Sequence, residues 1–137
     1  MAGTISIEQA LIYTMVSMSA VEGRINTTEL SEIGHIVKRL PVFGRFDHDR
    51  LTTVAQEVAA ILQEPEGLNA MLGLVADALS PKLRETAYAL AVEVAASDLA
   101  VGKEELRFLA ILRDRFGLDK LVTSALERSA IARYRTA

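Results

Sequence analysis

Four acidic residues stand at equivalent places in two stretches of the chain that lie 76 residues apart. Glu22 and Asp98 each end a predicted helix, and Glu29 and Glu105 each open the next helix seven residues later. If the two stretches pack about a pseudo-twofold axis, their turns bring the four carboxylates close together. Clustered carboxylates repel one another, so they either take up protons or bind a cation. Oxygen ligands of this kind favour calcium, magnesium or manganese over zinc.

The same positions also have a structural interpretation. Glu29 and Glu105 are each the third residue of a predicted helix, where a glutamate caps the backbone and faces the positive end of the helix dipole. Glu22 and Asp98 end helices, where the dipole disfavours a negative charge. Two hypotheses therefore stand for Glu29 and Glu105, capping and cation binding. The unfavourable placement of Glu22 and Asp98 favours a functional role for those two.

Residue types suited to catalysis are sparse. The chain has no cysteine, so disulfides, thiolate zinc sites and cysteine nucleophiles are excluded. His35 lies almost opposite the apolar stripe of its predicted helix and should face water, and His48 stands between two aspartates at a helix start. Glu32 and His35 make one half of a di-iron carboxylate motif whose second half is missing. We therefore expect no enzymatic activity, because no base can be placed beside a nucleophile.

Helix signals recur along the chain and strand signals do not. Half of the residues are apolar and only seven are aromatic, and residues 86–97 carry five alanines and one charge, which lets helix axes approach closely. Capping residues, prolines at helix starts and a glycine at a helix end predict the helices. Their expected ranges are 6–21, 26–40, 47–62, 65–79, 80–97, 102–116 and 120–134. The sequence therefore predicts one all-α domain, residues 1–137, with about seven helices.

An internal repeat sets the expected architecture. A shift of 76 residues places the helical hairpin 10–40 on the hairpin 86–116, and two helices lie between the copies. The apolar arc is wider in the second copy, because Phe108 and Ile111 replace a glutamate and a histidine of the first. A wide arc is typical of a buried helix, and it is also what a helix needs to meet a protein partner through Phe108 and Ile111.

Charge and hydropathy narrow the class of protein further. The net charge of −3 gives no basic footprint for nucleic acid. The N-terminus lacks a basic stretch before an apolar one, so no secretory leader is expected. The uncharged run 10–21 is shorter than the ~20 residues that a membrane-spanning helix needs. We expect a cytoplasmic protein with protein partners, without nucleic acid and without a transmembrane segment, whose oligomeric state stays open.

Residues 19–30 and 95–106 share one pattern: the end of a helix, an acidic residue, an aliphatic residue and a glutamate that opens the next helix. With this pattern in both copies, the chain resembles the TerB-like family of tellurite-resistance proteins over about residues 8–118. The resemblance implies an all-helical domain of the response to tellurite and other toxic agents. It also implies a cytoplasmic partner of membrane-associated complexes.

The resemblance further implies a metal site at the acidic positions, which here are Glu22, Glu29, Asp98 and Glu105. The chain departs from the family pattern twice, because the family usually has aspartate at position 22 and glycine where Leu99 stands. The first hypothesis is a non-enzymatic stress-response module that binds a divalent cation (Ca, Mg or Mn). The alternative is a metal-free protein–protein interaction scaffold that uses an apolar helix face.

Overall fold

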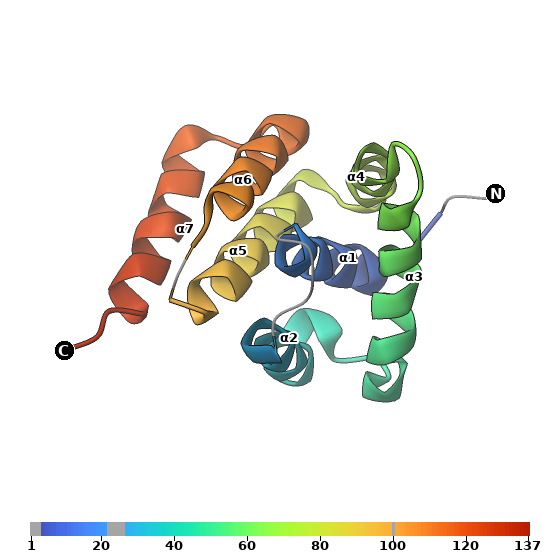
Figure 1. Cartoon of the computed structure of the whole chain (residues 1–137), viewed down its shortest axis with the longest axis horizontal. Helices are drawn as coiled ribbons and strands as arrows, with labels where there is room; N and C mark the ends of the chain where they lie inside the picture. Colours follow the sequence, from blue (N-terminus) through green and yellow to red (C-terminus); the bar gives the residue numbers. More distant parts are fainter. Residues whose placement is uncertain (1–3, 22–26, 100) are drawn as a thin grey trace.

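The computed structural model describes residues 4–21, 27–99 and 101–137, and this part of the chain is all-helical, as predicted (Figure 1). Short 3-10 turns at Pro41–Phe43 and His48–Arg50 connect the second helix to the third. Within the described residues seven α-helices follow one another: α1 Ile7–Ala20, α2 Thr27–Arg39, α3 Leu51–Gln63, α4 Gly67–Ala78, α5 Pro81–Ser97, α6 Lys103–Phe116 and α7 Lys120–Arg133. The repeated hairpins correspond to α1–α2 and α5–α6.

Local capping explains most of the helix bounds. At the start of α1 the Gln9 backbone N–H donates to Ser6 Oγ at 3.0 Å, and the Ser6 N–H donates to the Gln9 side chain at 2.9 Å. This is the predicted capping box. Ser80 caps α5, with Pro81 as its first residue, and Gly117 ends α6 in the left-handed region at φ 63°. These three predictions are confirmed, because each depends only on residues close in sequence.

The predicted start of α4 at Pro65 is wrong by two residues. The helix begins at Gly67, after Glu66 in the left-handed region at φ 61°. There the chain folds back on the end of α3 so closely that a Cβ on Gly67 would lie 2.2 Å from the Ile61 carbonyl oxygen. Only glycine fits this approach, and it is the tertiary contact that sets where α4 starts.

The core is built around α1. Ten consecutive residues, Ala10 to Ser19, are buried, and α2 to α6 all pack against this helix (Figure 1). A helix buried on every side has to be apolar all round, which accounts for the uncharged run 10–21. No helix in the described residues is both long enough and apolar enough to cross a membrane.

The wide apolar arc of α6 faces this core. Phe108 is 1 % exposed and lies among the core side chains, and Ile111 is half-buried against them. A partner cannot reach Phe108 in this fold, so the interaction surface predicted around Phe108 and Ile111 has to be corrected. The width of the arc reflects contacts of α6 with α1, α4 and α5, which sequence periodicity alone does not reveal.

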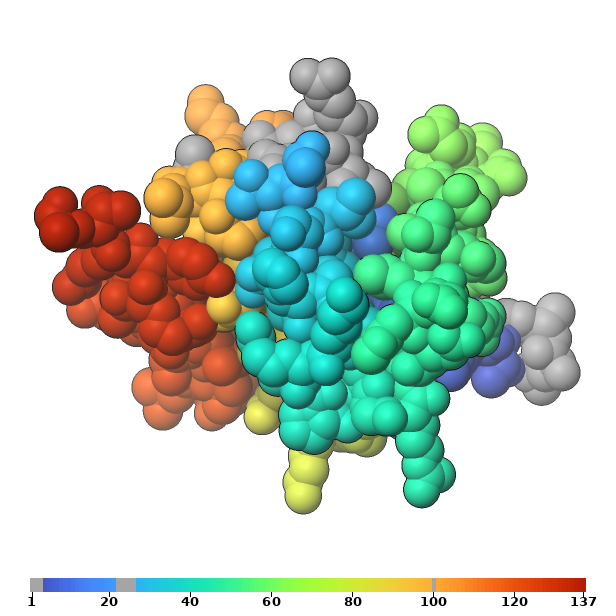
Figure 2. All heavy atoms as spheres, turned by 90° about the horizontal axis from the view of Figure 1, so that it is seen from below, coloured from blue at the N-terminus to red at the C-terminus, as the bar shows by residue number. Residues whose placement is uncertain are grey.

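α7 lies at the periphery, packed along α5 (Figure 1). Only Thr123 and Ala130 of its fourteen residues are buried. Seen from below, the helix and the C-terminal residues form a projecting lobe at the left edge of the molecule (Figure 2). A helix with so few buried residues gains little from the hydrophobic effect, so polar contacts have to contribute to its position.

Candidate interaction groove

The structure describes three of the four predicted acidic positions. Glu22 lies outside the described residues, and Asp98 is the C-cap of α5. Glu29 and Glu105 are the third residues of α2 and α6, and both are buried, at 2 % and 0 % exposure. Among residues 4–21, 27–99 and 101–137, no three histidine, aspartate or glutamate side chains are grouped so as to hold a metal ion.

Both buried glutamates accept hydrogen bonds. One carboxylate oxygen of Glu105 accepts from the Gly102 backbone N–H at 3.1 Å, which confirms its role as a helix cap. Glu29 accepts from Ser19 Oγ at 3.0 Å and thereby ties the start of α2 to the end of α1. Each of the two equivalent glutamates therefore helps to hold the start of its helix in place.

A groove with a volume of about 760 Å³ runs between α6 and α7 over the C-terminal half of α5. Small side chains of α5 form its floor, while α6 gives one wall and α7 the other. The apolar lining comprises Val92, Ala95 and Ala96 of α5, Leu106 and Leu109 of α6, and Ala130 and Ile131 of α7. Leu99 and Val101, between α5 and α6, also line it.

Exposed apolar side chains gather in this groove. Of the seven large apolar side chains that are exposed in the described residues, four line it: Leu99, Val101, Leu106 and Ile131. Single exposed leucines are ordinary on protein surfaces, whereas several in one concavity mark an interaction site. The groove is therefore a candidate interaction surface, at a different place from the one that the sequence predicted on α6.

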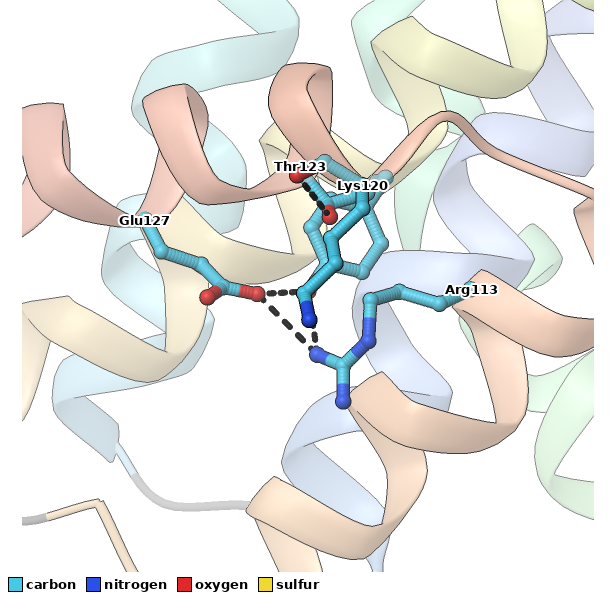
Figure 3. A network of polar contacts seen from close by, with 5 residues as sticks. Arg113, Lys120, Thr123 and Glu127 are labelled. Atoms are coloured by element: carbon cyan, nitrogen blue, oxygen red, sulfur yellow. Dashed lines mark hydrogen bonds and ion pairs between the residues drawn. The ribbon is translucent and has the colours of Figure 1, made fainter.

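An ion pair crosses the groove between α6 and α7. Arg113 Nη1 donates to Glu127 Oε2 at 3.0 Å and to the Tyr88 hydroxyl at 2.9 Å, and the Tyr88 hydroxyl donates to the same Glu127 oxygen. In Figure 3, Arg113 and Glu127 point toward one another, with Lys120 and Thr123 beside them on α7. Tyr88 of α5, Arg113 of α6 and Glu127 of α7 form one cluster, which is called the bridge below.

A second polar cluster fixes the C-terminal end of α7. The Tyr134 hydroxyl donates to Glu93 Oε2 at 2.7 Å, and Arg133 forms an ion pair with the same carboxylate at 2.7 Å. Glu93 belongs to α5, so the two clusters hold α7 at separate points along that helix. The apolar part of the groove lies between them and is left uncovered.

The backbone is strained at Leu99, which follows the end of α5 and lines the groove. Leu99 adopts φ 65°, in the left-handed region that favours glycine, while its side chain is 62 % exposed. A bulky residue in this region costs about 1 kcal/mol or more relative to glycine. Because the exposed side chain recovers little of this cost by burial, the strain points to a function at this part of the groove.

Sequence reasoning missed the groove. Its floor could have been anticipated, because the alanines of residues 86–97 allow close approach of another helix. Its walls could not, since they depend on where α7 docks. Leu106 is the clearest missed residue: the repeat aligns it with Leu30, and both are exposed.

Comparisons with protein-family models, with curated proteins and with solved structures gave no match. The resemblance to the TerB-like family is neither supported nor refuted by them and stays a prediction.

All three tyrosines of the protein donate a hydrogen bond from the hydroxyl to a glutamate on another helix. The pairs are Tyr13 with Glu57, Tyr88 with Glu127, and Tyr134 with Glu93. The pKa of each tyrosine is raised from 10.0 to about 12. Burial of the hydroxyl is the largest cause, and the adjacent glutamate carboxylate is the next.

We expect the free energy of unfolding to be maintained up to the unfolded-state pKa of about 10 and to fall as the pH rises to about 12. In that window the folded state holds tyrosine protons that the unfolded state has lost, so deprotonation favours unfolding. Tyrosinate absorbance during an alkaline titration measures this directly. A midpoint for the native protein equal to that in concentrated urea would contradict the three tyrosine–glutamate pairs.

Leu99→Gly should stabilise the fold by about 1 kcal/mol, because glycine adopts the left-handed conformation without steric cost. Urea unfolding of the variant beside the wild type measures the difference. Leu106→Gly is the matched control: it also removes an exposed leucine, but from a helix, and should destabilise by about 1 kcal/mol. Loss of stability in Leu99→Gly would contradict the strain at this residue.

Proposed function

We propose that the protein is a non-enzymatic helical module that binds a segment of a protein partner in the groove between α5, α6 and α7. The observation that carries the proposal is the exposure of Leu99, Leu106 and Ile131 within one concave surface. Exposed apolar area that is concave, rather than flat or convex, buries a ligand from three sides, and this is how binding sites for small segments are built.

The walls and floor of the groove suit a chain segment better than a small polar substrate. Lining residues of α6 recur at positions 106, 109 and 113, and those of α7 at 127, 130, 131 and 134, which is the spacing of one helix face. The alanines of the floor let a bound segment lie close to the α5 backbone. The polar groups of the bridge already pair with one another.

The proposal corresponds to the metal-free scaffold among the two hypotheses from sequence, with the binding surface moved to the groove. A role in the response to tellurite, and partners in membrane-associated complexes, rest on the family resemblance alone and stay predictions. The absence of catalytic function also stays a prediction, drawn from the scarcity of suitable residue types in the sequence.

Glutamate substitutions in the groove test the proposal. Peptides selected from a phage-displayed random library on the wild-type protein should bind Leu106→Glu and Ile131→Glu at least about tenfold more weakly, because binding would bury an unpaired charge. Leu121→Glu is the matched control: Leu121 is exposed on α7 but lies outside the groove lining, so binding should be unchanged. Affinities are measured by fluorescence anisotropy.

Circular dichroism and urea unfolding establish that each of these variants is folded, which the exposure of the substituted side chains predicts. Selected peptides that bind all three variants as tightly as the wild type would contradict the groove as the binding site.

A divalent cation is the second candidate ligand, and the two buried glutamates support it. Glu29 and Glu105 occupy equivalent third positions of α2 and α6, and a buried carboxylate is stabilised by a nearby positive charge. With Glu22 and Asp98, they are the residues that we propose for calcium, magnesium or manganese. Because Glu105 also caps α6, a cation at this site would have to share its carboxylate with the Gly102 N–H.

Calorimetric titration of chelator-treated protein with each of the three cations tests this candidate. We expect saturable binding of about one ion, lost in Asp98→Asn because a charged oxygen ligand is removed. Asp77→Asn is the control, since Asp77 is an exposed acid of α4. Absence of heat at millimolar cation, or equal binding by both variants, would contradict the site.

A further inference from the structure

We infer that the occupant of the groove is an amphipathic helix of a partner protein, about four turns long, with acidic residues along one edge of its apolar face. The inference rests on the proposed function and names the class of partner that the groove takes.

The length of the occupant follows from the length of the furrow. A second hollow, with a volume of about 700 Å³, continues the groove past the bridge toward the α6–α7 connection, and the two hollows share Arg113 and Glu127. Together they follow α7 from Lys120 to Tyr134. At about 1.5 Å per residue this stretch is ~21 Å long, which matches a helix of about fourteen residues.

The helical form of the occupant follows from what the walls offer. Both walls and the floor are α-helices, whose backbone N–H and C=O groups are already paired within each helix. An extended segment would find no free backbone partners in the apolar part, and its own backbone groups would be buried without hydrogen bonds. A helical segment satisfies its backbone internally and presents only side chains to the groove.

The acidic edge follows from charge. Residues 101–137, which include α6 and α7, hold eight bases and five acids, whereas residues 1–100 hold seven bases and thirteen acids. Arg128 is exposed on α7, three residues before Ile131, and Arg135 is exposed just beyond the end of α7, where it lines the groove. Neither arginine forms an ion pair with another residue in the described part of the chain. Acids beside the partner's apolar face would pair with them.

A second copy of this chain fits the groove poorly. Across a two-fold axis the same surface has to meet itself, and two concave surfaces leave a void between them. A flat lipid surface also fits poorly, because it cannot reach the side chains at the floor of the groove, Ala95 and Ala96. A convex, rod-shaped ligand fills the space that both of these leave open.

Random sixteen-residue peptides displayed on phage, selected on the protein of residues 1–137, provide the test. We expect the enriched sequences to carry apolar residues at helical spacing with aspartate or glutamate beside them, and to gain helical circular dichroism on binding. Their binding should be lost in Ile131→Glu. Enrichment of neutral, basic or proline-rich peptides that still need Ile131 would overturn this inference and leave the proposed function standing. Absence of any peptide that depends on the groove would overturn both.

Charge reversal tests the arginine edge. In Arg128→Glu/Arg135→Glu, acidic peptides should bind about tenfold more weakly at low salt, and the difference should shrink as salt is added. The control Arg45→Glu/Arg50→Glu reverses two exposed charges between α2 and α3 and should change binding little. Equal loss in both double variants, or none in either, would overturn the proposed edge.

Two measurements distinguish a helical protein partner from the two alternative occupants, a second copy of this chain and a lipid surface. Sedimentation equilibrium of the wild type would overturn the inference if it showed a dimer that Ile131→Glu dissociates. Cosedimentation with vesicles containing phosphatidylserine would overturn it if the protein bound them through Arg128 and Arg135 and acidic peptides did not compete. We expect a monomer, and no vesicle binding that survives an excess of the selected peptide.

Discussion

α1 contributes an unbroken run of buried residues from Ala10 to Ser19, and the rest of the fold is arranged to cover it. Because such a helix has no face that water could solvate, it needs neighbours on every side, and α2 to α6 provide them. Two of its buried polar side chains are hydrogen-bonded: Thr14 Oγ1 donates to the Ala10 carbonyl oxygen at 2.9 Å, and Ser19 donates to Glu29. The buried Ser17 Oγ has no hydrogen-bond partner among the described residues. Glu29, the buried glutamate of α2, is therefore one of the side chains that cover α1.

The position of α7 is a consequence of this arrangement. Once α2 to α6 enclose α1, a seventh helix can pack only on the outside of this layer, and α7 buries only Thr123 and Ala130. The bridge and the Glu93 cluster hold it to α5 instead. Since polar clusters act at points and not along a continuous apolar seam, the space between them stays open. The groove is what remains when a helix is attached in this way.

Much of the fold could be predicted from sequence, and much of the site could not, for physical reasons. The start of α5 at Ser80 and Pro81 and the end of α6 at Gly117 depend on a few neighbouring residues, so local rules located them. The start of α4 depends on contact between Gly67 and α3, and the burial of Phe108 depends on which helices surround α6. The groove needs the docking of α7, for which the sequence holds no local rule.

Two residues other than glycine break local backbone preference in the described part of the chain, and they differ in an instructive way. Glu66 adopts its left-handed conformation in the tight turn that brings Gly67 against α3, so the fold itself explains it. Leu99 has no comparable reason, because glycine would serve the turn better and an exposed leucine adds little to the core. Residues that adopt an unfavourable backbone conformation without helping the fold tend to lie at functional sites. Leu99 lines the groove, so the strained backbone and the exposed apolar surface lie at the same place. Both features favour binding there.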